Sequence, residues 1–168
     1  EKSGRIDIII NNAGILRDTV LWKMTDEDWE QVLAIHAGGT FKFTRAAVPH
    51  FRAQNYGRIV NVTSYTGLHG NTGQANYATA KAGIIGLTKT SAKELARFGV
   101  TVNAISPNAK TRMVASIPED KMAYLTAQNP MGRFAEAEEI APAIAFLASE
   151  ESGYITGTVL PVDGGISM

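Results

Sequence analysis

The chain has 168 residues, of which 45% are hydrophobic and 19% are charged, and these values are typical of one globular domain. Lys and Arg together number 16 and so do Asp and Glu, so no net charge favours nucleic acid or an anionic membrane as a partner. The absence of cysteine excludes disulfides, cysteine-ligated zinc and thiol nucleophiles.

The first predicted element is a strand over residues 6–10, Ile6-Asp7-Ile8-Ile9-Ile10, whose β-branched run is typical of a buried strand in a parallel sheet. The small-residue turn Asn11-Asn12-Ala13-Gly14 follows it. A long helix is expected to begin at the capping box Thr25-Asp26-Glu27-Asp28 and to end near Ala53. Inside it, Gly38-Gly39 predicts close packing against another backbone or a kink.

The rest of the chain continues to alternate strands with helices. This alternation predicts βαβ units, and therefore one parallel sheet with helices on both faces. The predicted elements are a strand over 58–64, a glycine-rich loop over 64–75, a helix over 76–98 that Gly99 stops, a strand over 100–105 that Ser106-Pro107 ends, a short helix over 118–127, a helix over 136–149 and a strand over 159–162, whose Pro161 indicates a sheet edge.

Tyr77 and Lys81 lie four residues apart on a predicted helix, and so on the same face, one turn apart. This spacing alone is weak, because most such pairs are a core aromatic and a solvated lysine. Ser64, however, ends the preceding strand, and ligands of open α/β sheets bind beyond the carboxyl ends of the strands. Three such ends, at 11–14, Ser64 and 107–111, are expected to converge on one crevice. A hydroxyl, a phenol and an ammonium gathered there predict a proton-donating site for a carbonyl oxygen.

Together with Tyr154-Ile155-Thr156-Gly157 and Val162-Asp163-Gly164-Gly165, these motifs resemble the short-chain dehydrogenase/reductase superfamily over essentially the whole chain. The chain is most similar to the 3-oxoacyl-acyl-carrier-protein reductases and to the 3-hydroxyacyl-CoA dehydrogenase domains of peroxisomal multifunctional enzymes. The resemblance implies an α/β fold, the C-terminal part of a Rossmann-like doubly wound parallel sheet with family strands 4-5-6-7. Residues 1–168 would form a single truncated domain that lacks the N-terminal third of the family fold.

The resemblance implies an NAD(P)-dependent oxidoreductase that interconverts a 3-oxoacyl thioester and its 3-hydroxyacyl thioester by hydride transfer. Tyr77 is the implied acid and base, Lys81 is expected to lower its pKa, and Ser64 would donate to the same substrate oxygen. The residues that select NAD or NADP would precede residue 1, and no metal site is expected. The implied cofactor contacts are Asn12, Ala13, Gly14, Tyr77, Lys81, Pro107 and Thr111.

Two positions depart from the family pattern. His36 stands where the family usually has an asparagine that anchors a water in the proton relay, so His36 is included among the implied catalytic residues. A buried core histidine is the commoner fate of such a residue, but a ring nitrogen is able to hold the same water. Asn108 replaces the glycine that usually follows Pro107. Because asparagine tolerates left-handed backbone, the turn is expected to survive.

Asn55 and Phe98 occupy positions where carrier-protein reductases place basic residues, which favours CoA over acyl carrier protein as the thioester carrier. A homo-oligomer, dimer or tetramer, is expected, with a cytoplasmic location, or a peroxisomal one for a eukaryotic multifunctional enzyme. Without the family's first third, the strand at 6–10 becomes an exposed edge, and the isolated chain is expected to bind dinucleotide weakly and to be inactive. Two alternatives stay open: an incomplete fragment that acts as an oligomerisation module, and a dehydrogenase with a non-acyl alcohol or ketone substrate.

Overall fold

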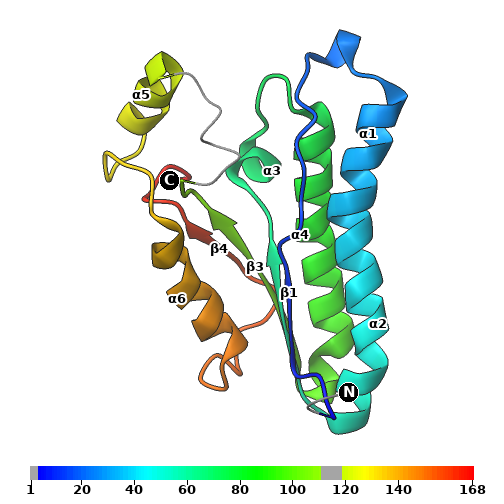
Figure 1. The fold of residues 1–168 in the computed structure, drawn as a ribbon. Helices are drawn as coiled ribbons and strands as arrows, with labels where there is room; N and C mark the ends of the chain where they lie inside the picture. Colours follow the sequence, from blue (N-terminus) through cyan, green and yellow to red (C-terminus); the bar gives the residue numbers. More distant parts are fainter. Residues whose placement is uncertain (1–3, 111–118) are drawn as a thin grey trace.

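The computed structural model describes residues 4–110 and 119–168, which form a parallel four-stranded sheet with helices on both faces (Figure 1). The strand order β1-β2-β3-β4 confirms the predicted contiguous sheet. Among the described residues, no helix is both long and apolar enough to cross a membrane. The strands are β1 Ile8–Asn11, β2 Gly57–Val62, β3 Val100–Pro107 and β4 Val159–Val162. The α-helices are α1 Asp26–Leu33, α2 Gly39–Gln54, α3 Tyr65–His69, α4 Ala75–Leu95, α5 Glu119–Ala127 and α6 Ala137–Ala148.

A single long helical segment crosses one face of the sheet, as predicted. Thr25 caps its start, where the side-chain oxygen accepts a hydrogen bond from the Asp28 N–H at 3.1 Å. Between α1 and α2 the helix passes through a π turn over Ala34–Gly38. The irregularity expected from Gly38-Gly39 is therefore a local widening that ends at Gly38, and π turns of this kind often occur at functional sites.

The two faces of β2 pack against different helices, because neighbouring side chains point to opposite sides of a strand. Ile59 packs with residues of α2 and α4, and Val60 packs with residues of α6. Figure 1 shows α2 and α4 on one side of the sheet and α6 on the other. Both side chains are fully buried, and such burial stabilises a fold by about 1.5–3 kcal/mol per side chain. The register aligns Asn11 with Asn61 and Asn61 with Ala104. The carboxyl ends of β1, β2 and β3 therefore lie along the same side of the sheet.

The two outer strands behave as edges. In β1, Ile8 is 45% exposed and Ile10 is 47% exposed, which confirms the expected exposed hydrophobic edge. The prediction that this strand is fully buried is wrong, because only β2 pairs with it in the described sheet. At the other side, β4 carries Pro161 at an edge, as its missing N–H requires.

One local prediction is wrong. The segment predicted as a loop over 64–75 contains the short helix α3, and Ser64 caps it by accepting a hydrogen bond from the Thr66 N–H at 3.2 Å. Strand β3 runs on through Pro107, and Asn108 is not left-handed. Its N–H instead donates to the Val162 carbonyl at 3.0 Å, which continues the ladder with β4. Among the described residues, the non-glycine residue with a positive φ is Asn55, at 51°, where α2 ends.

Candidate active site

Helix α4 places Tyr77 and Lys81 one turn apart, near the carboxyl end of β2. The start of this helix is anchored by the fully buried Asn76. The Asn76 amide nitrogen donates to the Arg17 carbonyl at 3.0 Å, and its amide oxygen accepts from the Tyr77 N–H at 2.7 Å. Asn76 thus ties the backbone of Tyr77 to the segment after β1. Sequence reasoning missed this role, and the available signal was an asparagine directly before the tyrosine at a helix start.

Ser64 lies two residues beyond β2, and its side chain is near enough to the Tyr77 phenol to lower the pKa of that phenol. Its oxygen already accepts from the Thr66 N–H in the α3 cap, so its own proton stays available for donation. The predicted meeting of Ser64 and Tyr77 is therefore present in the structure.

Lys81 is 4% exposed, and its ammonium donates to the Val62 carbonyl at 2.7 Å. The ammonium nitrogen lies 5.4 Å from the centroid of the Tyr77 ring. Thr63 holds the same helical turn, since its hydroxyl donates to the Lys81 carbonyl at 2.8 Å. Burial lowers the pKa of Lys81 to about 8. An ammonium carries three N–H donors, so donors remain beyond the one that Val62 engages.

The expected lowering of the Tyr77 pKa is wrong for this structure. Burial raises the pKa of Tyr77, the side chain of Ser64 lowers it, and the carboxylate of Asp18 raises it further. The Lys81 ammonium lies against the ring, and burial of the phenol outweighs the attraction that was expected. Tyr77 is consequently a neutral phenol near neutral pH, which is the protonation state that a general acid needs.

His36 joins the site from the π turn and is 1% exposed. Its Nε2 lies 2.8 Å from the Ile15 carbonyl oxygen and 3.1 Å from the Ile15 N–H. Its ring meets the Tyr77 ring edge-on, with centroids 5.1 Å apart and planes at 90°. Burial lowers the pKa of His36, the backbone hydrogen bond to Ile15 raises it, and the positive charge of Lys81 lowers it, so the imidazole is neutral.

The segment Asn12-Ala13-Gly14 follows β1 directly, and Pro107 ends β3, so these residues lie beyond the strands on either side of β2. A Cβ built on Gly14 would overlap Cε1 of His36, so only glycine allows this approach. The Lys81 ammonium bonds to the carbonyl at the end of β2, the strand between these two segments, and its spare donors suit hydroxyl groups. The arrangement therefore fits the ribose and nicotinamide end of a dinucleotide. Thr111, also predicted to contact the cofactor, lies outside the described residues.

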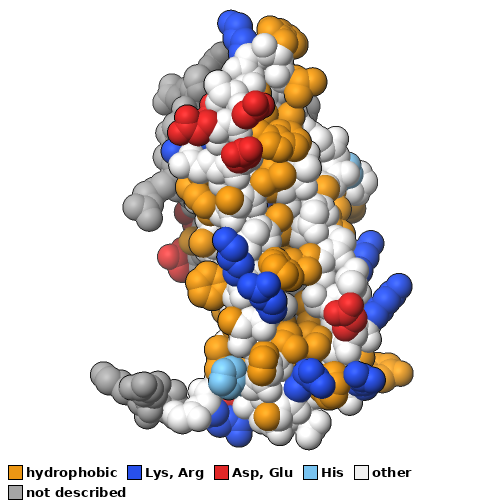
Figure 2. All heavy atoms as spheres, turned by 90° about the vertical axis from the view of Figure 1, so that its right-hand side faces the viewer, with side chains coloured by type: hydrophobic (Ala, Val, Ile, Leu, Met, Phe, Trp, Pro, Cys, Tyr) orange, Lys and Arg blue, Asp and Glu red, His pale blue; other side chains and the backbone are white. Residues whose placement is uncertain are grey.

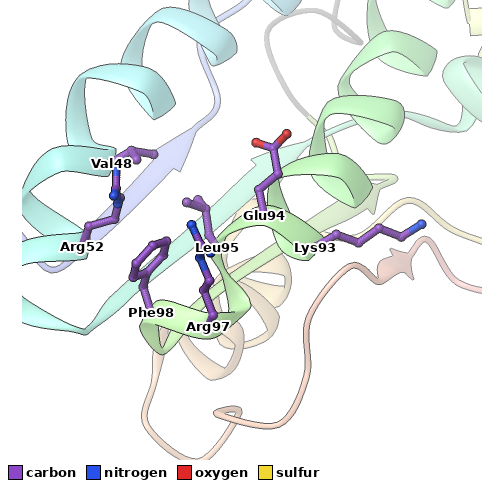
Figure 3. Close-up of a pocket in the computed structure, with 7 residues that line it drawn as sticks. All are labelled: Val48, Arg52, Lys93, Glu94, Leu95, Arg97 and Phe98. Carbon is purple, nitrogen blue, oxygen red and sulfur yellow. The ribbon is translucent and has the colours of Figure 1, made fainter.

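A second concave region lies at the other end of α4, with a volume of about 480 Å³ (Figure 3). The guanidinium groups of Arg52 and Arg97 each lie 4.7 Å from the centroid of the Phe98 ring. Lys93 follows Lys81 by twelve residues on the same helix, so the two are about 18 Å apart along its axis. We call this region the basic pocket. Its lining residues are Val48, Arg52, Lys93, Glu94, Leu95, Arg97 and Phe98.

Comparison with known proteins gives one family model and a set of relatives that share one name. A family model described as Enoyl-(Acyl carrier protein) reductase matches residues 1–167. The 3-oxoacyl-[acyl-carrier-protein] reductase FabG of Thermotoga maritima is 48% identical and covers 99% of this chain and 68% of its own length. The FabG proteins of Escherichia coli and Aquifex aeolicus are 45% and 47% identical, covering 98% and 96% of this chain and 68% and 65% of their own lengths. These bacterial names give no support to the expected CoA preference or to a peroxisomal location.

Proposed function

This chain belongs to the short-chain dehydrogenase/reductase family of oxidoreductases, and we propose that it reduces a 3-oxoacyl thioester to the 3-hydroxyacyl thioester, with NAD(P)H as the hydride donor. The observation that carries the proposal is the meeting of Ser64, Tyr77 and Lys81 beyond the carboxyl end of β2. All three groups are oriented for one task, the delivery of a proton to an oxygen that gains negative charge.

When bound, NAD(P)H would supply the hydride that the C3 carbonyl carbon of the thioester needs. Tyr77, a neutral phenol, transfers its proton to the carbonyl oxygen, which becomes the hydroxyl of the product. Ser64 donates a hydrogen bond to the same oxygen and stabilises its developing charge. The Lys81 ammonium then stabilises the phenolate that Tyr77 has become. Positioned proton transfer of this kind typically contributes about 10²- to 10⁴-fold in rate.

The cofactor contacts belong to the same proposal. Asn12, Ala13, Gly14 and Pro107 would line the nicotinamide end, and the spare Lys81 donors would bind the ribose hydroxyls. The backbone of the first segment can approach a ligand closely, because its side chains are small or, at Gly14, absent. The choice between NAD and NADP is left open by these contacts, which do not reach the adenosine ribose.

We propose acyl carrier protein, and not CoA, as the thioester carrier. Two observations support it: the printed names of the relatives, and the basic pocket. Asn55 and Phe98 lack the expected charge, but Arg52 and Arg97 lie against the Phe98 ring and place positive charge in the same region. An acidic carrier would complement that charge. The test compares turnover of the acyl-carrier-protein thioester with turnover of the CoA thioester. A preference for the carrier-protein thioester that disappears in the double variant Arg52→Ala/Arg97→Ala supports this part of the proposal.

Reduction of an enoyl thioester is the second candidate, and the description of the matching family model is the observation that favours it. That reaction places a proton on carbon. Two hydroxyl donors, Ser64 and Tyr77, suit an oxygen that keeps the transferred proton, as the C3 oxygen of a 3-oxoacyl substrate does, and they therefore favour that substrate.

The test is the substitution Tyr77→Phe, which removes the transferable proton and keeps the ring. Oxidation of NAD(P)H by 3-oxoacyl thioesters is measured on the protein as it occurs in the cell, with any segment that precedes residue 1 present. Turnover is expected to fall by about 10²- to 10⁴-fold. Tyr154→Phe, at a fully exposed tyrosine, is the matched control and keeps the full rate. Unchanged turnover in Tyr77→Phe would show the assigned mechanism to be wrong, and absence of turnover in the unmodified protein would favour the oligomerisation module.

A homo-oligomer is part of the proposal as well. Figure 2 views the side of the molecule on which α1, α2 and α4 lie, and hydrophobic side chains run along this face between charged groups. Phe41 and Phe43 of α2 are 45% and 66% exposed. A second copy of the chain that packs on α2 would cover them. Phe43→Glu is expected to shift the sedimentation coefficient towards that of a monomer, and Lys89→Glu on α4 tests whether any added negative charge has the same effect.

A further inference from the structure

Strand β3 is continued past its last residue by an extended segment, residues 108–110. The Asn108 N–H bonds to β4, and the Asn108 carbonyl accepts a hydrogen bond from the Ala135 N–H at 3.2 Å. The Lys110 N–H donates to the Ala135 carbonyl at 2.8 Å, so Ala109 and Ala135 form a short parallel bridge. Backbone hydrogen bonds thus join the end of β3 to the segment that leads into α6.

Two ion pairs lie on either side of this bridge. The Lys110 ammonium donates to the Glu136 carboxylate at 2.7 Å, which joins the β3 extension to the residue that follows Ala135. The Arg133 guanidinium donates to both oxygens of Glu139, at 2.6 and 2.7 Å, and the same carboxylate accepts from the Glu136 N–H at 2.9 Å. We call Lys110, Arg133, Glu136 and Glu139 the charge network.

The two ion pairs act on each other. The hydrogen bonds from Arg133 hold the pKa of Glu139 at about 2, and the positive charge of Lys110 also lowers it. The hydrogen bond with Glu139 raises the pKa of Arg133, and the charge of Glu136 raises it as well. An isolated exposed ion pair contributes little, but a bidentate arginine–carboxylate pair inside a network of charges contributes measurably.

The residue that this arrangement can position is Pro107, the proposed cofactor contact on β3. Strand β2 pairs with β3 only as far as Ile105, so Pro107 lies beyond the part of β3 that is held from both sides. Proline has no N–H with which to pair. The place of Pro107 is therefore set by β4 and by the segment 108–110 that follows it, and that segment is paired with Ala135.

We propose that Lys110 and Glu136 are positioning residues for the nicotinamide cofactor. Their ion pair, supported by the rest of the charge network, keeps the segment 108–110 paired with Ala135. That pairing fixes Pro107 at the edge of the proposed cofactor site. The inference rests on the proposed function for its effect on the cofactor. Its structural part, the pairing of the two backbones, is measurable without turnover.

The first test is Lys110→Met, which removes the charge and keeps the backbone hydrogen bond. On the protein as it occurs in the cell, the KM for NAD(P)H is expected to rise about two- to fivefold, with kcat within about twofold of wild type. Lys89→Met, at an exposed lysine of α4, is the matched control and keeps both values. An unchanged KM in Lys110→Met would overturn the proposal.

Salt should remove the difference between Lys110→Met and wild type. The Lys110 and Glu136 side chains are 61% and 57% exposed, so dissolved ions reach them. Between about 0.05 M and about 0.5 M NaCl, the ratio of the two KM values is expected to fall towards one, because salt screens the ion pair in wild type. A ratio that stays constant over this range would contradict an ionic origin of the effect.

A charge swap separates positioning from direct contact between Lys110 and an anionic group of the cofactor. Lys110→Glu places like charges side by side and is expected to raise the KM roughly tenfold. The double variant Lys110→Glu/Glu136→Lys restores an ion pair, so its KM should be closer to wild type than that of either single variant. A double variant as poor as Lys110→Glu would show that the ammonium acts directly, and would overturn the positioning role.

Hydrogen exchange tests the structural part without turnover. The Ala135 amide is expected to exchange about two- to fivefold faster in Lys110→Met and to be slowed again in the charge swap, while the Val60 amide of β2 is unchanged. Unchanged exchange at Ala135 would show that the charge network does not hold the segment 108–110. If wild-type protein binds no NAD(P)H, the proposed function fails, and the exchange at Ala135 still decides this structural part.

Discussion

Strand β2 has a buried cation at each end, and the two are held in opposite ways. Arg58, near its start, is 5% exposed, and Lys81, whose ammonium bonds to Val62 at its end, is 4% exposed. Neither forms an ion pair with a carboxylate among the described residues. A buried charge without an ionic partner is costly unless backbone groups satisfy it. The difference between the two lies in how many of their donors the backbone uses.

Arg58 is held by three backbone carbonyls and one aromatic ring. Its guanidinium donates to the carbonyls of Ser149 at 3.0 Å, Gly57 at 3.0 Å and Gly99 at 3.2 Å, and it stacks 4.5 Å from the centroid of the Tyr56 ring. These partners come from the end of α6, from β2 and from the residue before β3. Arg58 therefore joins three elements and has a structural role.

Lys81 has one such carbonyl partner, and its pKa is lowered to about 8 by burial. No second hydrogen bond from its ammonium is present among the described residues, and we assign the remaining donors to cofactor and substrate. A buried cation therefore stabilises the fold where backbone carbonyls accept from its N–H groups, and it serves chemistry where those N–H groups are left free. Substitutions at the two ends of β2 should accordingly change different quantities.

The largest expected effect is on turnover, in Lys81→Met. This substitution keeps most of the side-chain volume and removes the charge, so the phenolate of Tyr77 is no longer stabilised. The kcat for 3-oxoacyl thioester reduction is expected to fall by about 10²- to 10⁴-fold, while the free energy of unfolding stays close to that of wild type. A Lys81→Met protein that is active but unfolds readily would reverse the assignment of the two cations.

The next effect is on stability, in Arg58→Met. Three carbonyls lose a charged donor, and hydrogen bonds to charged groups contribute about 1.5–3 kcal/mol each before relaxation, so a total loss of about 3–4 kcal/mol is expected. Urea unfolding followed by circular dichroism measures it. The kcat of the folded fraction should stay within about twofold of wild type. A large kcat loss at unchanged stability would contradict the structural role.

The pH dependence of the free energy of unfolding is expected to distinguish Lys81 from Arg58 further. The folded pKa of Lys81, about 8, lies below its ordinary value of 10.5. Between these values the unfolded chain holds a proton that the folded chain has released, so the free energy of unfolding rises with pH across this window. Relative to Lys81→Met, wild type should gain roughly 3 kcal/mol between pH 8 and pH 10.5. A constant difference between the two proteins over this range would show that Lys81 is not held in a desolvated site.

The smallest effects are expected for substitutions of two glycines, Gly99 near the start of β2 and Gly14 near its carboxyl end. A Cβ on Gly99, whose φ is 67°, would lie 2.6 Å from the Asn55 carbonyl oxygen, so Gly99→Ala should cost about 2 kcal/mol of stability and leave kcat unchanged. A Cβ on Gly14 would overlap His36. Gly14→Ala should instead lower turnover roughly tenfold at a smaller stability cost. Identical phenotypes for the two variants would remove the distinction between the ends.

The order of elements and the central residues could be predicted from sequence because their signals are local. The β-branched runs, the Thr25 cap and Gly99 define elements through their own neighbours. The Tyr77–Lys81 spacing places both on one helical face, and the convergence of parallel strand ends brings Ser64 to them. These inferences need only the geometry of helices and sheets.

What sequence reasoning missed depends on burial and on contacts between distant segments. The direction of the Tyr77 pKa was wrong because it is set by how deeply the phenol is buried. The backbone clamp of Ile15 on His36 and the carbonyls around Arg58 involve main-chain atoms, which leave no residue-type signal. Arg97 stands beside Phe98 in the sequence, but Arg52 comes from another helix, so the sequence showed only part of the positive charge around this ring.

The most direct test of the central claim follows the transferred atoms. NAD(P)H that is deuterated at C4 of its nicotinamide ring is supplied with an equimolar mixture of a 3-oxoacyl and a 2-enoyl thioester of acyl carrier protein. The products are identified by mass spectrometry. We predict a 3-hydroxyacyl product with one deuterium at C3, formed by wild type and nearly absent with Tyr77→Phe, and an enoyl thioester that is left unreacted. A saturated, deuterated acyl product, or equal labelling by wild type and Tyr77→Phe, would contradict the assignment of Ser64, Tyr77 and Lys81 as a carbonyl-reducing site.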